Sequence, residues 1–388
     1  DGRFRVTGLN AGPCQVQLSS IGYAQMSLEP VELVAGAEYD VGTIRLARRT
    51  IRLSEVVVTP GSYSIMGDGP LRAQTLGRRE LENMSFAEDI TRAVSRLPGV
   101  ASTDFSSKFT IRGGEDDEVL MLLDGMELYE PFHQRDFVGG LFSIVDIETI
   151  QGIDLLTGGF SAEHGDRQSG VFSMTSNQAS KRRTSIGLSV MNARLYTEGT
   201  LGNDGSYLLS ARRGLLDKVK LMSVVDDETT HFFHDVMGKV EIPVGDKHRL
   251  SAHVLLAGDK AEVRDVEPGV AHDIHDTSFD NLYSWLRLTS THSPSLVSQT
   301  LLFGGNITHD RNGDTAKDEL TDKVTFRLTD NRSYQFFGLK QDWSWDAASR
   351  LAIKSGFSLK QLNAEYDYSF TLQDTRANND GIIVPYAD

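Results

Sequence analysis

The sequence contains very little cysteine, and this scarcity excludes several kinds of site. Cys14 is the single cysteine among 388 residues, so the chain can form no internal disulfide and no metal site built on thiolates. A lone cysteine usually behaves as a small buried apolar residue, and we interpret Cys14 in this way.

Long apolar runs are also missing. No stretch of about 18 or more apolar residues occurs, so the sequence predicts no transmembrane helix. A transmembrane β-strand needs only about 9–11 residues of alternating polarity, so a membrane-spanning barrel stays open. No signal peptide is visible, and the first residues read as the interior of a domain, so a missing N-terminus explains this at least as well as cytosolic residence does.

An excess of positive charge is absent too. The chain has 39 Lys and Arg against 54 Asp and Glu, a formal net charge of −15. Nucleic-acid binding proteins normally present a basic surface, so we exclude that partner. The sequence also lacks a Gly-x-Ser-x-Gly elbow, a phosphate-binding loop with Lys and a His-Glu-x-x-His motif. We therefore expect no enzymatic activity and no cofactor.

Alternating polarity dominates the C-terminal half, and 36 glycines against 10 prolines favour strands and turns. Residues 236–242, 250–256 and 351–359 each place apolar side chains on one face and polar or charged ones on the other. Short turns are predicted at 202–205, 245–247, 293–295 and 346–350, and long polar loops at 219–230, 264–280 and 310–322. This layout predicts about nine strands of an outer-membrane barrel. A soluble β-sandwich is the alternative.

The N-terminal half has different patterns. Short β-like runs separated by glycines predict a small β-sandwich over residues 1–49, followed by a linker at 50–70. Residues 71–180 mix a helix at 81–97 with strands at 109–111, 119–123, 144–153 and 171–174.

Five short motifs follow in order within the mixed region: LPGV at 97–100, FTIRGG at 109–114, VLMLLDG at 119–125, IETI at 147–150 and GGFSAEHG at 158–165. Together they resemble the plug of TonB-dependent receptors, which are outer-membrane proteins. The sequence YEPFH at 129–133 and residues 1–49 resemble the subfamily that carries an N-terminal carboxypeptidase-regulatory-like domain.

The resemblance implies a mainly β chain with four parts: the end of the regulatory-like domain at 1–49, a linker with a TonB box at 50–70, a plug at 71–180, and the first strands of a barrel at 181–388. The family's barrel has roughly twenty-two strands, and nine cannot close around a plug, so we expect a sequence truncated at both ends. It also implies the outer membrane of a Gram-negative bacterium, with the N-terminal domain in the periplasm.

Residues 54–60 are the candidate coupling segment: Ser54, Glu55, Val56, Val57, Val58, Thr59 and Pro60. A free extended segment rich in Val can add a strand to the sheet of a partner. The resemblance implies that this TonB box is grasped by TonB of the inner-membrane energy-coupling complex.

Other candidate residues lie in the plug motifs. Ile111 and Arg112 precede Gly113, and we expect Arg112 to pair with a carboxylate of the barrel wall or of the plug itself. Asp124 and Gly125 predict a tight turn. Tyr129, Glu130, Phe132 and His133 are the expected apex that meets the ligand.

The function implied is uptake of a scarce nutrient, small or oligomeric, with siderophore, glycan, peptide and cobalamin all open. A barrel with a permanently seated plug, serving structure or adhesion, is the alternative. His231 with His234, and His272 with His275, are weak candidates for binding a metal and are predicted to lie in loops. The simpler interpretation is that they are ordinary polar loop residues in contact with water.

Overall fold

The structure is a computed structural model. It describes residues 12–14, 17–18, 26–27, 31–34, 36, 39–41, 73–78, 81, 89–95, 97–102, 106–135, 140–165, 167–202, 204–215, 217, 229–267, 271–319, 322–348, 351–377 and 383–385. The chain divides into two units, residues 1–63 and 64–388. No helix in these described ranges is long and apolar enough to cross a membrane.

The first unit contains two small antiparallel pairs. Strand β1 (Gly12–Cys14) pairs with β4 (Val31–Leu33), and β2 (Gln17–Leu18) pairs with β3 (Met26–Ser27). The coupling segment predicted at 54–60 lies outside the described residues. The assignments of residues 1–49 and 50–70 therefore stay predictions.

The plug region, residues 73–177, is built on a five-stranded sheet of order β5-β12-β13-β8-β9. The strands are β5 (Ala73–Gly77), β8 (Val119–Leu123), β9 (Met126–Glu127), β12 (Ile150–Leu156) and β13 (Gly170–Ser176). Helix α2 (Ile90–Val94) begins at Asp89, whose carboxylate accepts from the Thr91 N–H.

Smaller elements complete the plug region. Strands β6 (Val100–Ser102) and β7 (Phe109–Ile111) form one pair, and β10 (Phe132–His133) and β11 (Phe142–Ser143) form another. The 3-10 turns are η1 (Asp116–Glu118), η2 (Ile147–Thr149) and η3 (Ala162–His164). The predicted strands at 109–111, 119–123 and 171–174 are confirmed. The strand predicted at 144–153 begins only at Ile150, because η2 precedes it.

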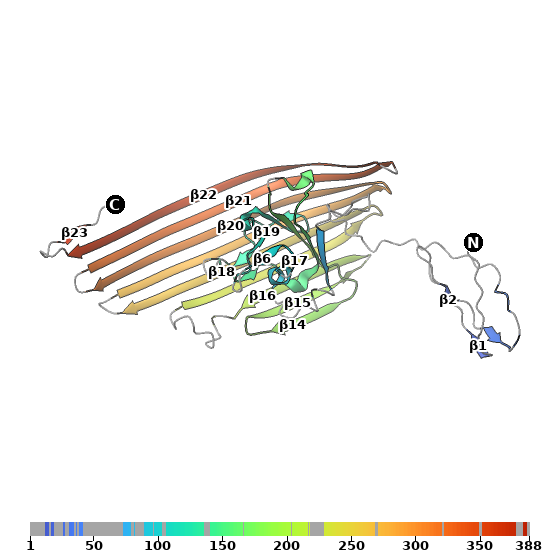
Figure 1. Ribbon diagram of the computed structural model, residues 1–388, viewed down its shortest axis with the longest axis horizontal. Coiled ribbons are helices and arrows are strands. Elements are labelled where there is room, and N and C mark those ends of the chain that lie inside the picture. The colour runs from blue at the N-terminus through green and yellow to red at the C-terminus, as the bar shows by residue number, and fades with distance from the viewer. Residues whose placement is uncertain are drawn as a thin grey trace. The chain divides into compact units, whose positions relative to one another are not determined.

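The second half of the chain forms one antiparallel sheet of ten strands in sequence order, which we call the wall (Figure 1). Its strands are β14 (Arg183–Leu188), β15 (Asn192–Leu201), β16 (Gly205–Gly214), β17 (Thr229–Val244), β18 (His248–Glu267), β19 (Ala271–Ser293), β20 (Leu296–Glu319), β21 (Asp322–Ala348), β22 (Leu351–Ala377) and β23 (Ile383–Pro385). The four predicted short turns fall between consecutive strands as expected.

The wall exposes apolar side chains on its outer face and buries charged side chains on its inner face. Ile186 and Leu359 are exposed on the outer face, whereas Lys239 and Glu241 on the inner face are only 4% and 1% exposed. A soluble sandwich buries its apolar face, so this arrangement contradicts the soluble alternative. A barrel in lipid has the observed polarity.

Two of the predicted long loops are wrong. Strands β18 and β19 extend through most of residues 264–280, and β20 and β21 extend through 310–322. In Figure 1 these strands continue past the plug region toward the left of the view. We call the part of the wall with an apolar outer face the apolar band. Beyond it both faces of the strands carry polar side chains, so the alternation that identifies a strand is missing from the sequence.

The plug region packs on the inner face of the wall. Its buried residues, such as Leu123 and Phe172, share one apolar cluster with Met237, Leu255 and Tyr283 of the wall. The core of the plug region therefore continues into the wall, and any movement of one against the other must separate apolar surfaces.

Candidate functional site

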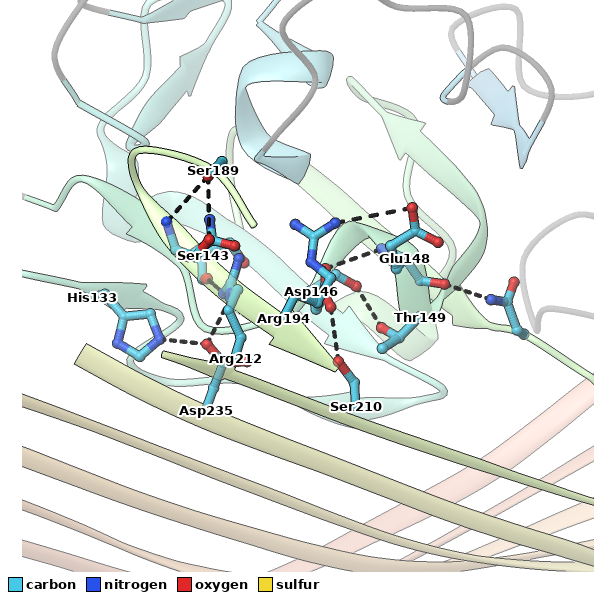
Figure 2. Close-up of polar contacts among 12 residues, drawn as sticks. His133, Ser143, Asp146, Glu148, Thr149, Ser189, Arg194, Ser210, Arg212 and Asp235 are labelled. Carbon is cyan, nitrogen blue, oxygen red and sulfur yellow. Dashed lines mark hydrogen bonds and ion pairs between the residues drawn. The ribbon is translucent and has the colours of Figure 1, made fainter. Parts of the chain in front are cut away.

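The contact between the plug region and the wall is the candidate functional site, because several buried charged groups meet there (Figure 2). Asp146 caps η2 through a hydrogen bond from the Glu148 N–H. The same carboxylate lies 3.2 Å from the Arg194 Nε of β15 and accepts a 2.8 Å hydrogen bond from Ser210 of β16. One carboxylate thus joins a plug turn to two wall strands.

Glu148 extends this group toward the start of the wall. Its carboxylate lies 3.2 Å from Arg183 of β14 and 3.7 Å from Arg78, which directly follows β5. These side chains are partly exposed, so each pair contributes little by itself. Together they connect the first described plug strand with the first wall strand.

A second group lies around Arg212 of β16. Its Nε donates to the Asp235 carboxylate of β17 at 2.8 Å, and its Nη2 donates to the Ser143 carbonyl of β11. The Ser143 N–H donates to Asp89 at 2.5 Å. All four residues are buried, so this group is a desolvated ionic contact between the plug region and the wall.

Next to Arg212, the β10 residue His133 bridges two wall carboxylates. Its Nδ1 is 2.7 Å from Asp259 of β18, and its Nε2 is 3.1 Å from Asp235. The ring is 1% exposed and stacks on Phe233 at 4.5 Å between ring centroids.

A third group surrounds Asp124, in the turn between β8 and β9. Asp124 and Gly125 have φ values of 49° and 89°, as in a tight hairpin turn, which confirms the predicted turn. The carboxylate accepts from the Ser176 N–H at 3.1 Å and lies 3.5 Å from the His253 Nδ1 of β18. Lys239 of β17 donates to the Ser176 hydroxyl at 3.1 Å.

The charge of Asp124 is set by its surroundings. Burial by itself would raise the pKa of this carboxyl group, but Lys239, His253 and Arg287 together hold the pKa well below its ordinary value of 3.8. Asp124 is therefore ionised in the folded protein, and its charge contributes to stability at neutral pH.

Asp124→Asn is expected to weaken the attachment of the plug region by about 1.5–3 kcal/mol at pH 7, because hydrogen bonds to a charged acceptor are lost. A depressed folded pKa stabilises above the unfolded value near 3.8 and loses this effect as the pH falls through the folded value. The difference from wild type should therefore shrink below about pH 4. Pulse proteolysis in urea at several pH values measures it. Asp117→Asn, at an exposed plug position, is the control and should change little.

A fourth contact reaches the opposite part of the wall. Lys360 of β22 pairs with Glu127 of β9 and donates to the Tyr129 hydroxyl at 3.3 Å. Arg167 holds the other oxygen of Glu127 at 2.6 Å. Burial would raise the pKa of Glu127, but Lys360 and Arg167 outweigh it and lower the pKa. The plug region is thus attached to wall strands on both sides.

The predicted plug residues are found partly as expected. Ile111 is buried, and Gly113 has a φ of 78°. Arg112 is exposed, with a φ of 54°, and reaches no wall carboxylate in the described part of the chain. At Asp146 the roles are reversed, because the arginine, Arg194, belongs to the wall and the carboxylate to the plug region.

The four predicted apex residues all lie against the wall. The Glu130 N–H donates to the Tyr283 hydroxyl at 3.2 Å, and the Tyr129 ring packs 5.0 Å from that of Phe336. Phe132 and His133 are buried. A ligand could reach these two only after their wall contacts break, and the ligand role stays a prediction for all four.

The histidine pairs lie on strands, which corrects their placement in loops. His231 and His234 belong to β17, where side chains three positions apart face opposite sides of the sheet, so they cannot share one ion. His275 of β19 pairs with Asp273 at 2.7 Å. His272 is on the same strand, and its side chain is outside the described residues. Within the described ranges no group of three His, Cys, Asp or Glu is placed to hold a metal.

Sequence reasoning missed Asp146, Arg194, Arg212 and Asp235. The sequence does contain a signal for Arg212 and Asp235, because both are charged residues at inward-facing positions of strands with alternating polarity. A formal charge at a lumen position next to a plug predicts an ionic contact, but the partner requires the fold.

Residues 67–171 match the TonB-dependent Receptor Plug Domain. FpvA of P. aeruginosa, solved with bound pyoverdine, has 12% identity and a TM-score of 0.50, over 81% of this chain and 46% of its own. The outer membrane transporter YddB of Escherichia coli has 9% sequence identity and a TM-score of 0.48, over 78% of this chain and 54% of its own. The siderophore receptor PirA of Acinetobacter baumannii has 12% sequence identity and a TM-score of 0.40, over 80% of this chain and 59% of its own.

No curated protein matches the chain. The chain spans about half to three fifths of the length of these solved structures. The plug-domain match covers the region that packs on the inner face of the wall, and the likeness to FpvA supports the same fold. Residues 67–171 are therefore a TonB-dependent receptor plug domain, and it packs on a wall with the fold seen in FpvA.

Proposed function

We propose that this receptor imports a scarce nutrient ligand across the outer membrane, with energy delivered by TonB to residues 54–60. The observation that carries the proposal is the plug domain packed on the inner face of a wall whose outer face is apolar. A seated plug blocks passage, and its movement requires work. Outer membranes lack an energy source of their own, so the work must arrive mechanically from the inner membrane.

The orientation supports this mechanism. The plug precedes the wall in sequence, and the coupling segment precedes β5, the edge strand of the plug sheet. A pull on residues 54–60 would therefore reach β5 first. We place this N-terminal side in the periplasm and the long hairpins of β18–β22 outside the cell, where they surround the ligand path.

A permanently seated plug is the second candidate, and one observation favours it. Arg212, Asp235 and His133 form a buried ionic contact, and breaking one partner of such a contact is costly. The two functions differ in whether the plug ever moves, so an import assay separates them.

Replacing residues 54–60 with a Gly/Ser segment of equal length should leave ligand binding within about twofold, because the wall and plug are untouched. Import by intact cells should fall by at least about tenfold, because TonB would lose its strand-addition site. Radiolabelled ligand, identified first by its depletion from mixed media, measures both. The same replacement at residues 61–66 is the matched control and should import normally. Undiminished import in the first variant would contradict the proposal.

A further inference from the structure

Hairpin β10–β11 brings a histidine into a two-carboxylate site in the wall. The His133 Nδ1 lies 2.7 Å from Asp259, and the Nε2 lies 3.1 Å from Asp235. A neutral imidazole has one N–H and one lone pair, whereas an ionised carboxylate can only accept. Both contacts are hydrogen bonds only when His133 is an imidazolium with two N–H donors.

Both carboxylates also accept hydrogen bonds from other donors. Asp235 accepts from the Arg212 Nε at 2.8 Å, and Asp259 accepts from the Gln134 N–H at 2.8 Å. A proton on either carboxylate would therefore compete with an existing donor. The proton that satisfies this group belongs on the His133 ring.

The charges around His133 come from several elements. Wall strands contribute Arg212 from β16, Asp235 from β17 and Asp259 from β18. The plug side contributes Asp89, before α2, and Asp146, before η2, both near Arg212. Carboxylates outnumber guanidinium groups here, so loss of the imidazolium charge leaves Asp259 with no cationic partner within 4 Å among the described residues.

The backbone next to His133 is strained. Gln134, next to His133, has a φ of 58°, in the left-handed region that residues other than glycine adopt at a cost. Its N–H donates to Asp259, and its side chain donates to the Phe232 carbonyl at 3.3 Å. The strained conformation is thus held by wall groups that also hold His133.

Burial would lower the pKa of His133, but Asp259 and Asp235 outweigh it and raise the pKa above its ordinary value of 6.5. A histidine with a raised folded pKa contributes stability that is fully present below about pH 6.5. This contribution is lost as the pH rises through the folded value.

We propose that His133 is a protonation-dependent latch: as an imidazolium it fastens hairpin β10–β11 to strands β17 and β18, and loss of its proton releases that hairpin while the rest of the plug stays seated. The other attachments include Arg194 with Asp146 and Lys360 with Glu127, and neither pair contains a histidine. The latch regulates the plug, so its biological meaning rests on the proposed transport function.

Hydrogen exchange by mass spectrometry on the purified full-length receptor in detergent tests the latch. Peptides covering β10 and β11 are compared with those covering β12 and β13 at pH 6 and pH 9. After correction for intrinsic exchange rates, protection of the hairpin should fall by about tenfold more than that of the reference strands. Equal changes in wild type would overturn the proposal, and this arm needs no variant.

His133→Gln supplies the second arm, because the amide offers one donor group and no titration. Its hairpin should be poorly protected at pH 6 and should show no further loss at pH 9. A wild-type pH response in this variant would also refute the latch. His164→Gln is the matched control, since His164 is a buried plug histidine that pairs with Glu163 within the plug. The exchange experiment contains no ligand and no TonB, so a failed import assay does not change its result. Likewise, a failed exchange experiment would not contradict the proposed import.

Discussion

Arg212→Met is expected to destabilise the attachment of the plug to the wall by about 3–5 kcal/mol, because it leaves buried carboxylates without their cation. Arg212 is 3% exposed and is bound to Asp235 and to the Ser143 carbonyl. Methionine fills similar volume, so the loss is mainly electrostatic. Pulse proteolysis of the plug across a urea series measures the change.

The neighbouring residue is a control of the same type. Arg213 pairs with Asp217 at 2.7 Å, but its side chain is 42% exposed. Arg213→Met should change the attachment of the plug by less than about 1 kcal/mol, because water screens the exposed guanidinium and its pair with Asp217 includes no plug residue. Equal losses for the two variants would show that burial of Arg212 does not hold the plug.

Leu286→Arg is expected to reduce the free energy of folding into lipid vesicles by about 2–4 kcal/mol, because it places a charge on the lipid-facing side of β19. Leu286 is 43% exposed on the outer face, in line with Leu282. In water such an exposed position would accept arginine at almost no cost. The fraction folded after dilution from urea into vesicles, followed by gel mobility without boiling, measures the effect.

Ser278→Arg tests the extent of the apolar band. Ser278 lies on the same face of β19, eight positions before Leu286, beyond the point where Asp280 ends the apolar row. Because this part of the strand extends past the lipid, the substitution should leave folding nearly unchanged. A large loss of folding free energy for Ser278→Arg would show that the membrane extends further along β19. No loss for Leu286→Arg would contradict a lipid-facing wall.

Local patterns in the sequence were sufficient for much of the fold. The alternation at residues 236–242 and 250–256 correctly predicted strands with one apolar face, and the turn at Asp124 and Gly125 was recognised from its residue types. The hairpins beyond the apolar band were missed, because their polar residues look like loops. Pairing with neighbouring strands makes them strands, and no single segment encodes that.

The candidate site shows the same division. The sequence by itself determined that the chain contains a plug, which its motifs predict at 71–180 and the family match places at 67–171. It also determined that charges such as Arg212 and Asp235 occupy one face of their strands, since side-chain direction follows from a period of two. Only the tertiary structure decided that His133 meets Asp259, 126 positions away, because a long-range ionic contact depends on how the plug is seated on the wall. Burial then sets the strength of that contact, since the same charges in water would interact only weakly.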